Sequence, residues 1–396
     1  MRILSRLSGS GWIVAFAIRR LEVPSLCGPA ISWARPPNIA SKPRELPFDF
    51  DSILSRAMTL RLRDNWLWDF WHVWHGEDCH LFYLQAPRSL GSPELRHHSA
   101  TIGHAISRDL KNWTVIDDAL HPGADGDWDD LATWTGSVIG HQGRWFMLYS
   151  GVNRSEAGLI QRIGLATSAD LYVWEKHPAN PILEADPRWY EVLDLTTWYE
   201  QAWRDPWLFR DESDGSFHAL ITARSRLGAP DTRGVIGHAR SLNLRDWDIL
   251  PPLATPGGFG HLEVPQLVHA SDRFFLLFSY ASKDPTRSRV ERSDKPASTG
   301  TYCLVSDQAL GPFNFSSGGR LAVDTIGSLY GGKLIEDRFG GLQFLAFSMF
   351  GRDGRFIGEL TDPFPVTLDS GLPEVEILSD DGGRPSEHSD EAKGFR

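Results

Sequence analysis

The sequence has few of the features that mark several large classes of protein. Its 396 residues include only three cysteines, Cys27, Cys79 and Cys303, and their wide spacing matches neither a disulfide framework nor a metal-binding motif. This cysteine usage fits a reducing compartment, and so a cytoplasmic location, better than an extracellular one. Lysine and arginine form no block, and the formal net charge is −11. Nucleic acid is therefore not an expected partner, because phosphate binding needs clustered positive charge.

The apolar run near the N-terminus is short. It covers residues 12–18, too few to cross a bilayer, so no membrane partner is expected. Arg19 and Arg20 follow it directly, which is the wrong flank for a signal peptide. Secretion remains the alternative if residues 1–30 act as such a peptide.

Two terminal segments lack periodicity. Residues 1–57 are rich in proline and residues 379–396 are polar, and both are predicted to be disordered. Residues 1–57 are read as a disordered or non-native extension, with Met58 as an alternative start. The ordered domain is expected to cover residues 62–378.

What the sequence does contain is a fivefold repeat. A short apolar and aromatic run recurs with start-to-start spacings of 64, 72, 57 and 69 residues. Helical periodicity is nearly absent between residues 62 and 370. The pattern predicts an all-β fold, a five-bladed β-propeller with four-stranded antiparallel blades; a β-sandwich or a parallel β-helix explains so long a repeat less well. The runs are HLFYLQ (80–85), RWFMLYSG (144–151), SFHALITA (216–223), RFFLLFSY (273–280) and LQFLAFSM (342–349).

Three carboxylates lie at similar distances before these runs. Asp69 and Asp205 each lie 11 residues before the run that follows them, and Glu263 lies 10 before its run. Thr135 and Tyr330 hold the corresponding positions in the second and fifth repeats. The first strand of each propeller blade lines the central channel, so the three acids are expected to converge at one end of it. The plainer interpretation, three unrelated surface acids, does not explain the common register.

Crowded carboxylates suit the cleavage of a glycosidic bond. Acids around one point cannot all ionise easily, so their pKa values separate and leave one charged nucleophile and one neutral acid. The tryptophans beside them offer apolar platforms for a sugar ring, although tryptophan also fills ordinary cores. Arg204 can donate to hydroxyl groups in a fixed fork or can pair with a carboxylate. His72, His104 and Trp71 are interpreted as structural.

At these residues the sequence resembles glycoside hydrolase families 32 and 68, the invertase, inulinase and levansucrase group. The resemblance covers roughly residues 62–370, and no single motif decides it. The motifs occur in the family's order: WLWDFW (66–71), HLFYLQ (80–85), GHAISRDLKNW (103–113), WTGS (134–137), WRDP (203–206) and HLEVP (261–265).

The resemblance implies a role for each acid. Asp69 would attack the anomeric carbon of a β-linked fructofuranosyl unit, Glu263 would act as acid and base, and Asp205 would stabilise the transition state. Two displacements would retain the configuration, which requires carboxyl groups about 5–5.5 Å apart. A small carbohydrate would be the only partner, with no metal and no cofactor; the oligomeric state is left open. The expected sugar contacts are Trp68, Gln85, Trp134, Ser137 and Arg204.

Departures from the family pattern affect the substrate more than the chemistry. Trp68 and Phe70 flank Asp69, and Val264 stands where family 32 commonly has cysteine. The repeats run to about residue 370, so the C-terminal β-sandwich of family 32 is not expected. Three alternatives remain: a fructosyltransferase on the same scaffold, an inverting arabinanase- or xylosidase-type propeller, and a non-catalytic carbohydrate-binding propeller.

Overall fold

The computed structural model describes residues 60–281, 298–324 and 327–375. The predicted N-terminal extension, the predicted C-terminal tail and Cys27 lie outside these residues. No helix in the described ranges is long and apolar enough to span a membrane.

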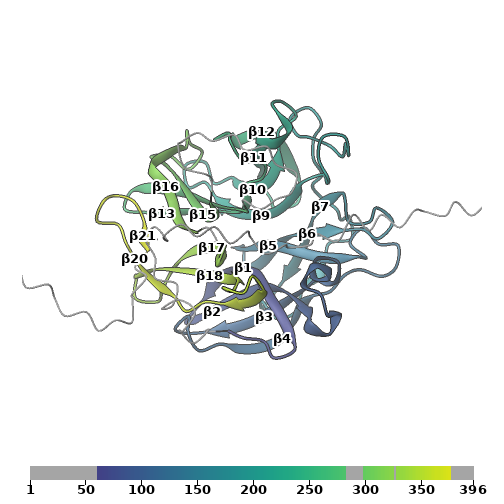
Figure 1. Cartoon of the computed structure of the whole chain (residues 1–396), viewed down its shortest axis with the longest axis horizontal. Helices are drawn as coiled ribbons and strands as arrows, with labels where there is room; N and C mark the ends of the chain where they lie inside the picture. Colours follow the sequence, from purple (N-terminus) through teal and green to yellow (C-terminus); the bar gives the residue numbers. More distant parts are fainter. Residues whose placement is uncertain (1–59, 282–297, 325–326, 376–396) are drawn as a thin grey trace, which may run out of the picture. The chain divides into compact units, whose positions relative to one another are not determined.

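The described chain forms five antiparallel sheets, each continuous in sequence, which are the blades of a β-propeller (Figure 1). The predicted all-β propeller is confirmed. In the first four blades the strands follow one another in space as they do in sequence. The five predicted aromatic runs are the second strands β2, β6, β10, β14 and β18.

Blade one contains β1 (Asn65–His75), β2 (Asp78–Pro87), β3 (Thr101–Ser107) and β4 (Thr114–Leu120), with the short 3-10 helices η1 (Arg88–Leu90) and η2 (Pro93–Ser99) between β2 and β3. Blade two contains β5 (Ala132–His141), β6 (Arg144–Val152), β7 (Gln161–Ser168) and β8 (Glu175–Lys176). Blade three contains β9 (Trp203–Arg210), β10 (Phe217–Arg224), η3 (Pro230–Thr232), β11 (Gly234–Ser241) and β12 (Trp247–Ala254). Blade four contains β13 (Glu263–Ala270), β14 (Arg273–Tyr280), β15 (Thr299–Ser306) and β16 (Asn314–Asp324). Blade five contains β17 (Leu329–Glu336), β18 (Leu342–Phe350), β19 (Phe356–Leu360), β20 (Phe364–Thr367) and β21 (Glu374–Val375).

Blade five has a divided third strand. β19 pairs with one end of β18, through Phe347 opposite Leu360, and β20 pairs with the other end, through Phe344 opposite Phe364. The two short strands together occupy the place that one strand holds in the other blades. The chain also closes here, because Leu60 forms an antiparallel bridge with Leu360.

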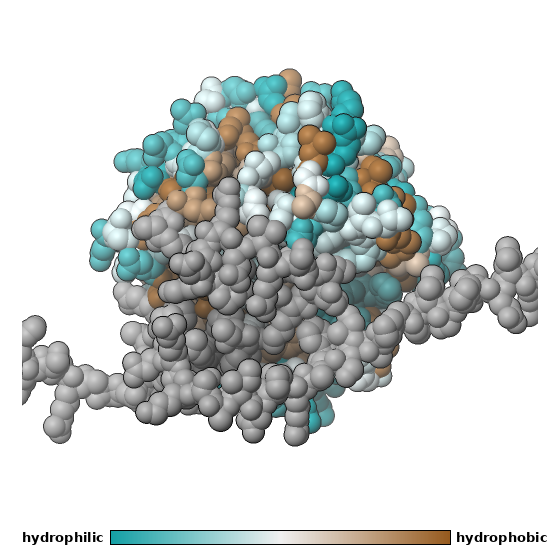
Figure 2. All heavy atoms as spheres, turned by 45° about the horizontal axis from the view of Figure 1, so that its top comes forward, coloured by the Kyte–Doolittle hydropathy of each residue, from teal (hydrophilic) through white to brown (hydrophobic). Residues whose placement is uncertain are grey.

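Burial follows the place of a strand within its blade. Every residue of β10 is buried, including the polar His218, Thr222 and Arg224, since a central strand is covered on both faces by the neighbouring blades. The outer strand β4 has five residues that are exposed or partly exposed and carries two aspartates. On the face seen in Figure 2, hydrophobic residues lie in small groups between hydrophilic ones.

Several tryptophans and histidines belong to the cores of blades. Trp71 is fully buried and stacks on Phe82 with ring centroids 6.0 Å apart. His104 shares a 2.9 Å hydrogen bond with His80 inside blade one, and the same arrangement recurs between His218 and His238 in blade three. These contacts favour the structural interpretation of Trp71 and His104.

Candidate active site

The first strand of every blade contains a β-bulge, and β1, β5, β9, β13 and β17 surround the centre of the propeller (Figure 1). Four of the bulges have a residue with positive φ: Asp69 (35°), Asp205 (56°), Val264 (46°) and Gly331 (63°). A bulge redirects a side chain, and left-handed backbone at a non-glycine residue is strained, so this pattern is typical of a functional site.

The three acids were predicted to share one register, but the bulges show that Glu263 lies one residue away from the position that Asp69 and Asp205 hold. Asp69 and Asp205 are bulge residues, whereas Glu263 pairs with Ser279 just before the bulge of blade four. Its equivalent in blade three is Arg204, which pairs with Thr222. The acids therefore start from two adjacent positions in the sheet and still meet across the channel.

Asp69 lies in a partly buried position on β1. Its Oδ2 atom is 3.4 Å from the hydroxyl of Thr135 on β5. Burial, and then the charges of Asp205 and Glu263, raise the pKa of Asp69 to about 7, whereas Lys333 opposes the rise. This carboxyl group is therefore poised to change its charge near neutral pH.

Asp205 is held by neighbours from three blades. Its Oδ2 accepts hydrogen bonds from Thr222 Oγ1 at 2.8 Å and from the Val264 amide at 3.3 Å. Its own amide donates to Ser150 Oγ at 2.8 Å. The residue is only 5% exposed, and burial and the charge of Glu263 raise its pKa against the lowering effect of Arg204.

The side chain of Glu263 is 24% exposed, whereas that of Asp205 is 5% exposed. The Oε1 atom of Glu263 is 2.5 Å from Arg204 Nη2 and 3.8 Å from His261 Nδ1. Its Oε2 atom accepts a short hydrogen bond from the hydroxyl of Tyr330. The carboxylate is thus oriented from blades three and five while its side chain remains partly exposed.

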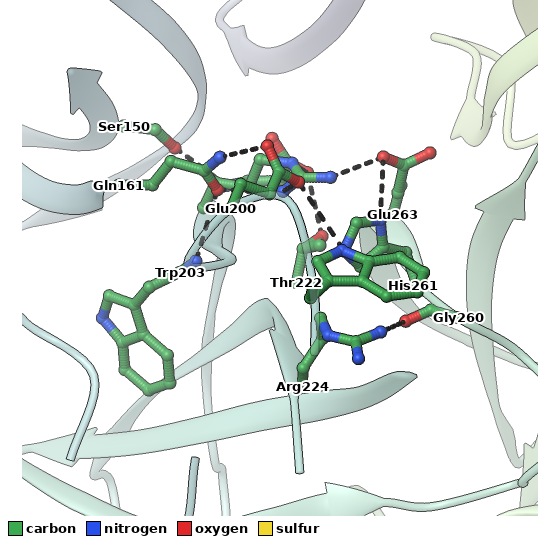
Figure 3. Close-up of polar contacts among 12 residues, drawn as sticks. Ser150, Gln161, Glu200, Trp203, Thr222, Arg224, Gly260, His261 and Glu263 are labelled. Carbon is green, nitrogen blue, oxygen red and sulfur yellow. Dashed lines mark hydrogen bonds and ion pairs between the residues drawn. The ribbon is translucent and has the colours of Figure 1, made fainter. Parts of the chain in front are cut away.

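Arg204 connects the acids to the polar side chains of Gln161 and Glu200, both of which Figure 3 labels. Its Nη1 atom donates to Glu200 Oε1 at 2.8 Å and to Gln161 Oε1 at 2.9 Å. Gln161 in turn donates to Glu200 Oε2 at 2.7 Å. The guanidinium group, 3.4 Å from Asp205 at Nε, therefore serves three carboxylates at once.

A buried clamp supports the same wall of the site. Arg224 donates to Glu191 at 2.6 Å and to the carbonyl of Gly260 at 2.7 Å, and its guanidinium lies 3.5 Å from the ring centroid of Trp198. Trp198 Nε1 donates to His261 Nε2 at 3.0 Å. Figure 3 shows Arg224, Gly260 and His261 below and beside Glu263. This clamp fixes the loops that carry Glu200 and His261.

The predicted sugar contacts differ in how they relate to the acids. Among the described residues, Arg204 is the one of them with an ion pair to the acids. Arg204 contacts both Asp205 and Glu263, and Trp68 and Trp134 lie together around His97, whose ring is 6.0 Å from that of Trp68 and whose carbonyl accepts from Trp134 Nε1. Neither Gln85 nor Ser137 has a hydrogen bond to the three acids within the described ranges. Gln85 bonds to Asn65, Thr101 and Asp118 within blade one. Ser137 accepts from the Leu208 amide at 2.8 Å and so joins blades two and three. For all of these residues, binding of sugar stays a prediction.

Several residues at the site were not among the predicted ones. Tyr330 and Thr135 had been placed in register but given no role. Glu200 lies four residues before Arg204 and outside the quoted motifs, whereas His261 is the first residue of HLEVP (261–265) but was given no role. Arg96 comes from η2 and its side chain lies over Trp68, 5.4 Å from the ring centroid. Buried Lys333 is the one charged residue between Leu329 and Ile335, which was a signal that the sequence did offer.

One group in the described residues has metal-ligand spacing. It comprises Asp211, Asp214 and His218 at the far end of β9. Asp214 already bonds to Ser216 and Arg240, and His218 bonds to Ser216 and His238. At the central site the acidic groups face Arg204 and Lys333 instead, an arrangement that suits acid and base catalysis.

The sequence profile of the glycosyl hydrolases family 32 N-terminal domain matches residues 64–314, more than half of the chain. This protein belongs to that family. The match includes β1, β9 and β13, the strands that carry the three acids. The resemblance to family 32 is therefore confirmed.

Two curated relatives are a beta-fructofuranosidase and a sucrase. A cell wall isozyme of beta-fructofuranosidase from Pisum sativum is 29% identical over 210 residues, which are 51% of this chain but 34% of that protein. An extracellular sucrase of Zymomonas mobilis is 24% identical over 307 residues, 66% of this chain and 71% of the relative. This chain thus spans about a third of the first relative. Both names describe proteins outside the cytoplasm, so the cytoplasmic location stays a prediction.

A solved structure supports the fold. The inulosucrase from Halalkalicoccus jeotgali, bound to kestose, has a TM-score of 0.66 and 20% identity, covering 81% of this chain and 90% of that one. At this identity the likeness concerns the propeller fold. Among the described residues of the present chain, every strand belongs to one of the five blades.

Proposed function

We propose that this protein is a retaining β-fructofuranosidase that cleaves sucrose or fructo-oligosaccharides. The observation that supports this most is the convergence of Asp69, Asp205 and Glu263 from three blades, with Arg204 and Tyr330 orienting Glu263. The names of the relatives from pea and Zymomonas agree with this substrate class. The partner is accordingly a small carbohydrate.

The reaction proceeds in two displacements. Asp69 attacks the anomeric carbon of the fructosyl unit while Glu263 protonates the departing glycosidic oxygen, which leaves with the bonding electrons. Glu263, now ionised, then removes a proton from water as the water attacks the same carbon and releases Asp69. Buried Asp205 accepts hydrogen bonds from ring hydroxyls and stabilises the positive charge that develops on the sugar.

The neighbours of Glu263 fit its double role. Arg204 contacts one carboxylate oxygen and Tyr330 donates to the other, so the group stays aimed while its proton comes and goes. The raised pKa of Asp69 means that the nucleophile is ionised only above about pH 7 in the absence of substrate.

Transfer of the fructosyl group to a second sugar is the other candidate. The inulosucrase with kestose bound has the same propeller over 81% of this chain, and the chemistry differs only in whether water or a sugar hydroxyl attacks in the second step. An accessible Glu263 can activate either acceptor.

Sugar release from a panel of sucrose, inulin, levan and aryl arabinofuranosides tests the proposal, with Asp69→Asn as the blank. Free fructose that appears only with the wild type supports hydrolysis, and fructosylated oligosaccharides support transfer. Release of arabinose, or no product from any substrate, would overturn the fructosyl assignment.

A further inference from the structure

Lys333 is a buried cation at the centre of the propeller. It lies on β17 directly after the blade-five bulge, and it is 2% exposed. Its ammonium group donates to the carbonyl of Val264 at 2.5 Å and to that of Pro265 at 3.3 Å. These two carbonyls belong to the blade-four bulge that follows Glu263. A single lysine therefore joins blade five to the segment that positions the proposed acid.

The strand that carries Lys333 also approaches the acid of blade one, since a Cβ atom at Gly331 would lie 3.2 Å from Asp69 Oδ1. The charge of Lys333 acts on Asp69 and on His72 from β1 and interacts with Asp205 from β9. The ammonium group also lies 5.5 Å from the ring centroid of Trp207 on β9. Burial lowers the pKa of Lys333 to about 8, against the raising effect of Asp69 and Asp205, so the group carries a proton at neutral pH and below.

The contacts also form a relay to Asp205. The Val264 peptide donates through its amide to Asp205 Oδ2 and accepts through its carbonyl from Lys333. Gln266 and Leu334 exchange two 2.8 Å hydrogen bonds beside this relay. Those bonds hold β13 to β17 independently of Lys333, so the strands have a second tie if the ammonium group is removed.

We propose that Lys333 is a positioning residue that favours the ionised form of Asp69 and holds the blade-four bulge behind Glu263. The proposal rests on the proposed glycosidase function. Without this cation, Asp69 would still face the negative charges of Asp205 and Glu263. Arg96 and Arg204 would be the nearby cations that remain. Asp69 would therefore ionise at higher pH. A lysine that only filled space or tied two strands together would not change the ionisation of Asp69.

The test compares Lys333→Met and Lys333→Arg with Lys176→Met in the full chain. Lys176 is a matched control in blade two, since it pairs with Asp129 at 2.6 Å and lies 5.7 Å from the ring centroid of Tyr149. The first readout is the pH dependence of kcat/KM for sucrose. We expect Lys333→Met to move the acidic limb upward by about one pH unit, because loss of a nearby opposite charge raises the pKa of a carboxyl group. Lys333→Arg, which keeps the charge, should lie nearer the wild type, and Lys176→Met should coincide with it.

A second readout does not depend on activity. The carboxyl carbon of Asp69, assigned by comparison with Asp69→Asn in protein labelled with ¹³C-aspartate, should titrate at higher pH in Lys333→Met than in the wild type. An unchanged Asp69 titration in folded Lys333→Met would overturn the proposal. A wild type that releases no fructose would instead refute the proposed function, while the titration would still decide the role of Lys333.

Discussion

Arg204 Nη2 lies 2.5 Å from Glu263 Oε1, and the same guanidinium group contacts Glu200 and Asp205. One buried cation is thus shared by three carboxylates from two blades and a loop. Such an arrangement fixes where the proposed acid points, and it also makes the stability of the site depend on a single side chain.

Arg204→Met should therefore destabilise the protein strongly. Removing one partner of a buried pair leaves uncompensated charge and costs about 3–5 kcal/mol. Urea unfolding at pH 7 measures the change, and the double variant Arg204→Met with Glu200→Gln should recover part of the loss, because one stranded carboxylate is removed with its partner. Equal midpoints for the wild type and Arg204→Met would contradict this role.

Gly331 lies close to Asp69, the proposed nucleophile. A Cβ atom at this position would lie 3.2 Å from Asp69 Oδ1 and 3.0 Å from the ring of Phe347, with φ at +63°. Gly331→Ala should lower kcat/KM by tenfold or more, in line with about 1.4 kcal/mol or more for a displaced reacting group. Gly354→Ala is the control, since Gly354 has φ +75° with no atom within 4 Å. Both variants carry backbone strain, so a similar loss of activity in both would rule out the steric explanation.

Glu263→Ala should reduce sucrose turnover by roughly 10²–10⁴-fold, the usual contribution of a general acid or base. Azide needs no base, so it should restore turnover of β-fructofuranosyl fluoride and give a fructosyl azide of retained configuration. Glu200→Gln, which alters a neighbour of Arg204 instead, should show no such rescue. An azide product of inverted configuration would point to the inverting alternative.

Asp69 should also make stability depend on pH. The unfolded chain ionises this group near its ordinary pKa of 3.8, whereas the folded chain retains the proton to about pH 7. Between these values the folded state binds more protons, so rising pH lowers stability through Asp69. Asp69→Asn carries no charge and escapes this loss. It should gain at most about 4 kcal/mol over the wild type from pH 4 to pH 8, and a constant difference in unfolding free energy would count against the raised pKa.

The sequence predicted the fold and the acids because both follow from local repetition. Each aromatic run became a second strand, and counting back from it located Asp69, Asp205, Thr135 and Tyr330 at their bulges or next to them. Glu263 was displaced by one position because the turns differ in length. β9 and β10 are joined across residues 211–216, whereas β13 and β14 are joined across residues 271–272 only. Counting residues through turns of unequal length cannot fix the register to one residue.

Contacts between blades were beyond the reach of the sequence. Ser137 lies in a motif of the family, yet its hydroxyl accepts from Leu208 of the next blade. Glu200 comes from a loop without repeat or motif, and His261 opens the HLEVP motif without a predicted role. Their contacts with Arg204 and Trp198 depend on how distant parts of the chain pack. Lys333 was visible as a charge among uncharged residues, but its partners at Val264 and Pro265 lie almost 70 residues earlier in the chain.

Trapping the covalent intermediate tests the central claim most directly. Glu263→Ala would be mixed with β-fructofuranosyl fluoride, whose fluoride leaves without protonation, and the quenched protein would be digested for mass spectrometry. The account predicts one added fructosyl group on the peptide that contains Asp69, and none in the double variant Asp69→Asn with Glu263→Ala. Fluoride release without any labelled peptide, or a label on Asp205, would contradict the assignment of Asp69 as the nucleophile.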